Sequence, residues 1–365
     1  MMQARWIVAF ALAVCAAPPA LCAQGCPIPD AMRTRMAGTR DADTFADLGI
    51  ALANAKQYAC AASAFAESLK TKPDSANVLF MFGASLDFSG NPQEAVAALQ
   101  ASETLDGRNL KLHLVLAAVF DQLHRDSDAV AEWKAAVETD PLSTEALDGL
   151  SQDLVLDQQD QAAIDLLDDP KVTGLRTALQ SLNLGTAYAG LAQLDAASEA
   201  LRDGLNTTPD SLPIAAELAD VLAQAHHADE ADAVLQLALA RHPADTETAL
   251  HRLRLLLAAD PQKATAVGRE LLRTAPGNWE VLYLNGVLAA QNGDMEQARA
   301  HLQAALALND ASPLAHSLLG VVLARLSDFS GAQLQLQRAI ALGDSSQEVR
   351  DNLARVEQAL PHGGP

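Results

Sequence analysis

The chain has 365 residues, of which 50% are hydrophobic and only 4% aromatic, and its formal net charge at neutral pH is −21. This composition is too apolar for a disordered chain, and its many Ala and Leu residues favour helices. A protein that binds nucleic acid needs a basic surface to neutralise phosphates. The acidic balance therefore excludes DNA, RNA and anionic lipid as main partners.

Residues 1–23 have the pattern of a secretory signal peptide. Arg5 supplies a positive charge, an apolar run follows over residues 6–17, and two prolines and small residues complete the segment. The apolar run is shorter than the roughly 20 residues that span a bilayer, so we expect cleavage rather than an uncleaved anchor. We therefore expect export to a periplasmic or extracellular location, with a lipid anchor on Cys22 or Cys26 as a minor alternative.

A short arm, residues 24–41, follows the predicted signal peptide. It contains Cys26, and the only other cysteine beyond the signal is Cys60. In an oxidising compartment a disulfide between them would fasten the arm to the helical segment that follows. Two free thiols are the alternative, because a sequence does not show whether the Cα atoms are close enough to bridge.

From residue 42 onward, small and large apolar residues recur in three columns with a period of about 34 residues. The first column holds mostly small residues: Gly49, Gly83, Ala117, Ser151, Gly185, Ala219, Leu253, Gly286 and Gly320. The second column holds alanine throughout: Ala61, Ala95, Ala129, Ala163, Ala197, Ala231, Ala264, Ala298 and Ala332. The third column is large and apolar with a single exception: Phe65, Leu99, Trp133, Leu167, Leu201, Leu235, Gly268, Leu302 and Leu336.

The stretch Leu284–Leu308 shows how one period is built. Gly286 lies where the first helix must let a neighbour come close, because glycine has no side chain in the way. Gly293 ends that helix, and Asp294 precedes the next helix as a capping residue, with Gln297 three positions later. The pattern predicts two antiparallel helices joined by a tight turn.

The columns and their period resemble the tetratricopeptide repeat, with about nine units over residues 42–344. The resemblance implies an all-α fold, a right-handed α-solenoid of stacked antiparallel helix pairs known as the tetratricopeptide-repeat superhelix. A single unit cannot bury its apolar face, so neighbouring units stack into one continuous core.

Two units depart from the pattern. In unit four, Pro170 falls where the second helix should continue, and in unit seven Leu253 occupies the small first column and Pro261 makes the turn one residue short. These positions are either hinges or tolerated irregularities. Residues 345–360 form an amphipathic segment that fits a capping helix over the last unit, and residues 361–365 form a short tail.

The resemblance also implies a groove lined by the first helix of each unit, in which a peptide or a partner's helix lies. The candidate groove residues are Asn77, Phe80, Asp87, Phe88, Asp121, Gln122, Asp148, Gln152, Thr186, Asp220, Gln224, Tyr283, Gln291 and Arg325. Across all groove positions the acidic residues are Asp43, Asp87, Asp121, Glu145, Asp148, Asp220 and Glu280, whereas only Lys111 and Arg325 are basic. Such a groove favours basic or amphipathic segments of other proteins, and Phe80, Phe88 and Tyr283 are candidate apolar anchors.

No catalytic, cofactor-binding or metal-binding motif is present, and the segments outside the repeats are too short for a catalytic domain. His226, His227 and Asp229 lie in one predicted turn, which we interpret as solvated rather than as a metal site. We therefore expect a non-enzymatic, exported scaffold for protein–protein interaction, in an assembly or secretion complex of the cell envelope. A regulatory or substrate-presenting subunit of an envelope enzyme system is the alternative.

Overall fold

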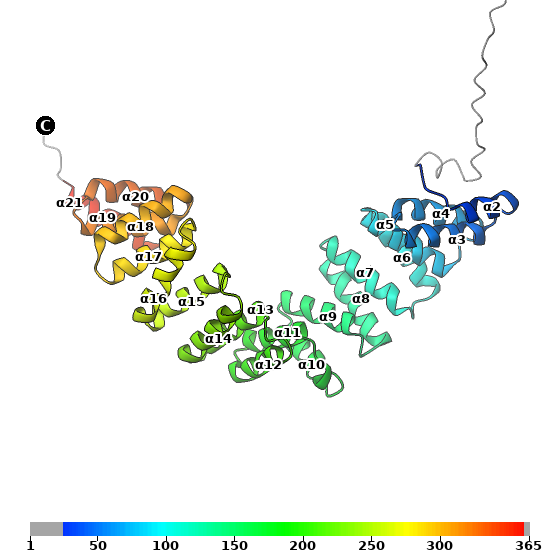
Figure 1. The fold of residues 1–365 in the computed structure, drawn as a ribbon, viewed down its shortest axis with the longest axis horizontal. Helices are drawn as coiled ribbons and strands as arrows, with labels where there is room; N and C mark the ends of the chain where they lie inside the picture. Colours follow the sequence, from blue (N-terminus) through cyan, green and yellow to red (C-terminus); the bar gives the residue numbers. More distant parts are fainter. Residues whose placement is uncertain (1–24, 361–365) are drawn as a thin grey trace, which may run out of the picture. The chain divides into compact units, whose positions relative to one another are not determined.

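The computed structural model describes residues 25–360, and over that range it contains twenty α-helices and no strand (Figure 1). The chain divides between Gln180 and Ser181 into two compact units. The predicted signal peptide, residues 1–23, and the predicted tail, residues 361–365, lie outside the described residues. Within residues 25–360, no helix combines the length and the hydropathy needed to cross a membrane.

The first unit begins with α2, which packs against α3, and continues with consecutive helices that pack as antiparallel hairpins. Its helices are α2 Asp30–Gly38, α3 Ala42–Asn54, α4 Tyr58–Thr71, α5 Ala76–Phe88, α6 Pro92–Leu105, α7 Leu110–Gln122, α8 Asp126–Thr139, α9 Thr144–Leu156 and α10 Asp160–Leu167, followed by the 3₁₀ turn η1 Thr173–Leu175.

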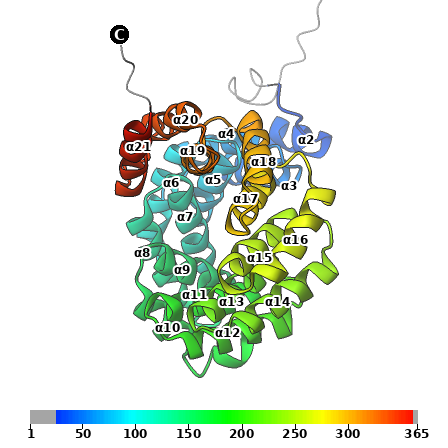
Figure 2. The same ribbon diagram turned by 90° about the vertical axis from the view of Figure 1, so that its left-hand side faces the viewer.

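The division between the units falls inside α11, and the helices after it form the second unit. They are α11 Ala178–Gly190, α12 Leu194–Thr207, α13 Leu212–Gln224, α14 Ala228–Arg241, α15 Thr246–Ala259, α16 Pro261–Thr274, α17 Trp279–Gln291, α18 Met295–Leu308, α19 Pro313–Arg325, α20 Phe329–Ala341 and α21 Gln347–Ala359. The last helix, α21, lies beside α19 and α20 (Figure 2).

Helices α3 to α20 form nine hairpins, which confirms the prediction of nine repeated helix pairs. In five hairpins a first-column glycine faces the third-column side chain of its own hairpin. A Cβ atom added to these glycines would lie 2.4–2.8 Å from the facing side chain, in the pairs Gly49–Phe65, Gly83–Leu99, Gly185–Leu201, Gly286–Leu302 and Gly320–Leu336. Since real Cβ atoms do not come that close, the glycine sets the distance between the two helices.

All nine alanines of the second column have no exposed surface. The third-column side chains beside them are also buried, from fully buried Phe65 to Trp133 with 6% exposure. A fixed small residue next to a fixed large one lets each hairpin close at the same spacing. The core of each of the two compact units is therefore a row of repeated contacts between hairpin helices rather than one central cluster.

In eight of the nine hairpins of the described residues, the turn carries a further regularity. One residue per turn has a positive φ, at Lys56, Gly90, His124, Gln158, Ala192, His226, Gly293 and Ser327. Only two of these eight residues are glycine, although a side chain in this left-handed conformation costs free energy. Closure of the hairpin therefore imposes the turn geometry on residues that do not favour it.

Repeat unit seven, the hairpin of α15 and α16, has no turn residue with a positive φ. Asp260 ends α15 and at the same time caps α16, accepting hydrogen bonds from the backbone N–H groups of Gln262 and Lys263 at 3.0 Å. Deletion of the left-handed residue accounts for the slip of one residue in the repeat period. In the same hairpin the column sizes are exchanged, since buried Leu253 stands in the first column and Gly268 in the third.

The space beside Gly268 is filled from the following hairpin. The Asn285 side chain of α17 donates a hydrogen bond from Nδ2 to the Gly268 carbonyl at 3.1 Å. A Cβ atom added to Gly268 would lie 2.7 Å from Asn285 Oδ1 and 2.8 Å from Leu288. The absent side chain therefore admits a buried amide between two hairpins.

In repeat unit four, the hairpin of α9 and α10, α10 ends at Leu167, and the η1 turn occupies the place where the helix would continue. The backbone around Pro170 closes through a hydrogen bond from Val172 N–H to the Asp169 carbonyl at 2.8 Å. Buried Val172 then anchors this segment in the core of the first unit.

The arm before the repeats is helical and covalently fastened. Cys26 and Cys60 form a disulfide with a Cα–Cα distance of 5.7 Å. Met36 of α2 is almost fully buried in the same cluster as Phe45 and Phe65. The arm thereby covers the apolar end of the first hairpin, as terminal elements of repeat arrays must.

Gly320→Ala tests the spacing set by the first column. The new Cβ would lie 2.6 Å from Leu336, so we expect the free energy of unfolding to fall by about 1–3 kcal/mol in urea denaturation followed by circular dichroism. The control is Gly277→Ala, where an added Cβ meets nothing within 4 Å and stability should not fall. The cost of Gly320→Ala should shrink in a Leu336→Ala background, and equal effects at both glycines would contradict a spacing role for Gly320.

Candidate functional site

The second unit contains an open hollow of about 740 Å³ formed by α17, α19 and α21. Its residues come from these three helices, with Met295 added from α18 and with Asp344 and Ser346 from the segment before α21. They are Tyr283, Val287, Ala290, Gln291, Met295, Leu314, Ser317, Leu318, Val321, Val322, Arg325, Asp344, Ser346, Glu348 and Val349. Ligand sites in proteins commonly have this volume, and the lining here combines apolar with polar side chains.

The apolar floor of the hollow rests on a well-packed core. Val322 and Val349 are almost fully buried, and Leu318 and Tyr283 pack against the same core cluster. Leu314, by contrast, is 61% exposed at the edge of the hollow. The hollow therefore offers exposed apolar surface on a rigid base, which is the arrangement of a surface that buries a partner's side chain.

Charges of both signs line the edge of the hollow. Arg325 comes from the end of α19, and Glu348 comes from the first turn of α21. Neither forms an ion pair with another residue in the described range 25–360. Asp344 accepts a hydrogen bond from the Ser346 backbone N–H at 3.0 Å, which keeps its carboxylate at the start of α21. The three charges remain available to a partner.

Tyr283 also lines this hollow. Its ring lies 6.4 Å from that of Trp279, measured between centroids, in a tilted arrangement. Burial, together with the nearby charge of Glu280, raises the pKa of the Tyr283 hydroxyl. Because this pKa is raised, Tyr283 presents a neutral hydroxyl on an apolar ring at neutral pH. Its neighbour Glu280 is paired with Arg254 at 2.7 Å.

The predicted groove residues do not all meet in one place. In the second unit the hollow brings together Tyr283, Gln291 and Arg325. Asp220 forms an ion pair with His251 at 2.7 Å, and Thr186 hydrogen-bonds to Glu217, whose pKa is raised by burial and by Asp220. These two positions thus take part in contacts between neighbouring helices, while Gln224 is exposed.

In the first unit several predicted groove residues also have partners within the chain. Phe88 is 65% exposed, but its ring stacks on Tyr58 with 4.8 Å between centroids. Asp148 accepts hydrogen bonds from Thr177 Oγ1 at 3.0 Å and from Gln180 Nε2 at 2.6 Å, and so holds the segment after η1. Asn77, Gln122 and Gln152 are at least partly exposed, and Phe80 is partly buried.

A pair of half-buried carboxyl groups connects α7 and α9. Asp121 and Asp153 are hydrogen-bonded to each other, and the Trp133 indole N–H donates to Asp121 Oδ2 at 3.2 Å. Asp153 Oδ2 is buried without a hydrogen-bond partner. A hydrogen bond between two carboxyl groups needs one shared proton, so the pair carries a single negative charge while it is intact.

Burial and the adjacent Asp121 raise the pKa of Asp153 to about 7, and burial also raises the pKa of Asp121. The other charges acting on the pair are the carboxylates Asp126 and Asp157, so no cation among residues 25–360 relieves the repulsion. On the neighbouring helix α5, burial raises the pKa of Asp87, whose Oδ1 is likewise buried without a hydrogen-bond partner. The raised pKa values of Asp87 and Asp121 favour the neutral form of two carboxyl groups in the predicted acidic groove.

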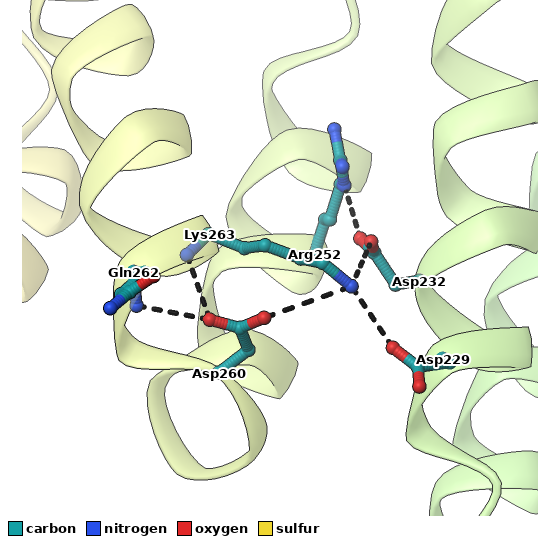
Figure 3. A network of polar contacts seen from close by, with 6 residues as sticks. All are labelled: Asp229, Asp232, Arg252, Asp260, Gln262 and Lys263. Carbon is teal, nitrogen blue, oxygen red and sulfur yellow. Dashed lines mark hydrogen bonds and ion pairs between the residues drawn. The ribbon is translucent and has the colours of Figure 1, made fainter.

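The turn with His226, His227 and Asp229 is held by ion pairs. His227 Nδ1 lies 3.2 Å from Glu230, and Asp229 is bound to Lys263 Nζ at 2.9 Å. Figure 3 shows that Lys263 belongs to a larger network in which Arg252 Nε donates to buried Asp232 at 2.6 Å. The carboxylates of this network already have cations of the chain as partners.

This network joins α14 to α15 and α16 at the irregular unit seven (Figure 3). Lys263 Nζ also lies 3.7 Å from Asp232 and 3.7 Å from Asp260, the residue that caps α16. Because Asp232 is only 5% exposed, removal of either cation would weaken the pairing of a buried charge. The network thus supports the hairpin in which the column sizes are exchanged.

Glu103, His113 and Glu132 form a second polar cluster in the first unit, which the sequence pattern does not predict. They come from α6, α7 and α8, and one nitrogen or oxygen atom of each lies within 4.8 Å of the others. No motif spacing indicates this group, because three different helices supply its members. The sequence pattern also does not predict the apolar side chains of the hollow, because the positions of Leu314 and Val321 are typical of core residues as well.

Asp153→Asn tests the carboxyl pair. A carboxyl whose pKa rises on folding binds its proton more tightly in the native state, so stability falls as pH rises between about 4 and 7. The amide of the variant has no proton to lose, and its unfolding free energy should depend less on pH. At pH 8 we expect the variant to be more stable by about 1 kcal/mol, after allowance for solvent screening of a partly exposed pair.

The measurement for this variant is urea unfolding at pH values from 5 to 8. Asp157→Asn is the matched control, because this neighbour acts on Asp153 only through its charge. An unchanged pH dependence in Asp153→Asn would contradict the shared proton.

One family of known proteins matches part of the chain. The family model for the tetratricopeptide repeat matches residues 255–326, from the later part of α15 to the end of α19. No curated protein matches the chain.

Several solved structures are similar in helical architecture. MamA of Desulfovibrio magneticus RS-1, from its residue 41 onward, has 16% identity, covers 47% of this chain and 96% of its own, and has a TM-score of 0.43. A thermophilic tetratricopeptide-repeat protein of Thermus thermophilus has 21% identity, covers 50% of this chain and 99% of its own, with a TM-score of 0.39.

PilW, a widely conserved type IV pilus biogenesis factor, has 20% identity, covers 56% of this chain and 96% of its own, with a TM-score of 0.45. At these identities the likeness concerns the fold alone. The family model matches residues 255–326, and the three columns recur through the nine hairpins of the described residues, so these hairpins have the architecture of tetratricopeptide repeats.

Proposed function

We propose that the protein is an exported, non-catalytic scaffold that binds other proteins in a cell-envelope assembly or secretion complex. Export is supported by the signal-like residues 1–23 and by the disulfide between Cys26 and Cys60, which suits an oxidising compartment. Tetratricopeptide repeats bind other proteins, which supports a scaffold role.

The hollow on α17, α19 and α21 carries this proposal. It combines a volume of about 740 Å³ with a lining of both apolar and charged side chains. Apolar anchors in a preformed pocket supply most of the binding energy at interfaces, and the surrounding polar groups set specificity. A protein segment with one or two apolar side chains on one face would fill the hollow.

The charges at the edge indicate the character of that segment. Asp344 and Glu348 lie on the side of α21, and Arg325 on the side of α19. Two carboxylates against one guanidinium favour a basic residue next to the apolar anchor, and the chain's net charge of −21 attracts a basic partner from a distance. The proposed partner is therefore an amphipathic segment that carries a basic residue beside its apolar face.

The test is crosslinking in native cells with Leu314→Asp and Glu348→Lys. Both side chains are exposed, so the fold should be retained, and each change removes one feature of the hollow. We expect the yield of the specific crosslinked partner to fall, with purified components binding about tenfold more weakly or worse, as for loss of one interface anchor. Circular dichroism checks that the helices remain.

Leu308→Asp is the matched control. Leu308 is 55% exposed, close to the 61% of Leu314, but it does not line the hollow. Partner binding that is equally weakened by Leu308→Asp, or unaffected by Leu314→Asp and Glu348→Lys, would contradict the use of this surface.

A further inference from the structure

The cluster of Glu103, His113 and Glu132 goes beyond a protein-binding role. Its three side chains come from consecutive helices of the first unit, α6, α7 and α8, and their ligand-type atoms lie within 4.8 Å of one another. His113 is only 3% exposed, and Glu132 is largely buried. Side chains that converge in this way inside a hairpin array require a specific cause.

The His113 ring has a fixed orientation. Its Nε2 lies 3.0 Å from the Gly107 carbonyl oxygen, which accepts a hydrogen bond from the N–H group there. Its Nδ1 then points at Glu132 Oε2, 2.8 Å away. A ring nitrogen and a carboxylate oxygen at that distance must share a positive charge, which is either a proton on the ring or a metal ion between them.

The same chain contains a matched version of this arrangement without the two glutamates. His316 of α19 occupies the position that His113 has in α7, with Nε2 3.1 Å from the Asp310 carbonyl and Nδ1 2.6 Å from Gln335 Oε1. At the sites equivalent to Glu103 and Glu132, this second arrangement has Leu306 and Gln335. Its one carboxylate, that of Asp310, lies on the other side of the ring, 3.4 Å from Nε2. In this second arrangement the buried His316 connects the loop at Asp310 to Gln335 of α20, and no carboxylate contacts its Nδ1.

The two carboxylates at His113 are therefore additional to the structural role of the ring. Within the described range 25–360, neither Glu103 nor Glu132 forms an ion pair with a lysine or arginine. The cluster consequently has more negative than positive charge in a partly buried setting, which is unfavourable without a further cation. An adjacent hollow of about 650 Å³, lined by Glu103 and His113 among others, gives access from solvent.

We propose that Glu103, His113 and Glu132 bind a divalent transition-metal ion, with His113 Nδ1 and one oxygen of each glutamate as ligands. Imidazole with carboxylates suits zinc and its neighbours better than magnesium or calcium, which prefer oxygen ligands alone. Three protein ligands leave the fourth position to water from the adjacent hollow. The Gly107 carbonyl holds the ring from behind, as an outer partner of a ligand histidine commonly does.

The test is titration of the untagged, chelator-treated full chain with zinc ions near neutral pH, in competition with a chromophoric chelator. We expect one saturable zinc site per chain and a higher melting temperature with zinc, because ligands from three helices bind the ion only in the folded state. In NMR spectra of the His113 ring, the signal of Nδ1 should change on zinc addition, whereas that of His316 should not.

The decisive variant is Glu103→Leu/Glu132→Gln, which reproduces the set found at His316 and should therefore fold. We expect its affinity for zinc to fall by more than about 100-fold, beyond the loss seen when only an outer partner is removed. Glu138→Gln is the control, because Glu138 lines the same hollow outside the three-residue cluster. Its affinity should be unchanged.

Equal zinc affinity in the wild type and the double variant would overturn the proposal, as would the absence of saturable binding by the wild type below millimolar zinc. Circular dichroism establishes that the double variant is folded. If it is not, Glu132→Gln alone provides the test, since Gln335 already shows that glutamine is compatible with the ring contact. Undiminished zinc binding by a folded Glu132→Gln would also overturn the proposal.

Discussion

The close contact between the two helices of each hairpin is the constraint on which the rest of this structure depends. Where the first column is glycine, as at Gly320, the facing leucine or phenylalanine occupies the space that a Cβ would need. The second-column alanines beside it have no exposed surface. This spacing presents the same faces of successive first helices side by side, and so it creates a surface that no single hairpin could form.

Irregular hairpins keep this contact by other means. In unit seven the large and small columns are exchanged, and buried Leu253 takes the role of the usual third-column side chain. Asn285 of the next hairpin fills the space beside Gly268. The Asp232–Arg252–Lys263 network connects unit seven to the preceding helix, α14. The shortened turn is compatible with the fold because Asp260 ends one helix and caps the next.

The same scaffold supports two kinds of site with different physical origins. The hollow on α17, α19 and α21 arises because the last hairpins leave apolar side chains exposed on a packed base, with charges of both signs at its edge. The cluster at His113 arises inside the first unit, where a structural histidine coincides with two glutamates from neighbouring helices. The histidine pair at His113 and His316 separates the structural role of the ring from the added carboxylates.

The sequence by itself determined the helical hairpins, their number and their period, because small and large residues must alternate wherever two helices touch closely. It also located the break at unit four and the short turn at unit seven, since proline and a missing residue act locally. Only the tertiary structure decided which polar groups meet. Asp121 and Asp153, like Glu103, His113 and Glu132, are brought together by helices that stack across hairpins, and Asp148 is taken up by Thr177 and Gln180. Periodicity fixes which face of a helix a residue occupies, but the charge, burial and partner of that residue depend on side chains from other helices.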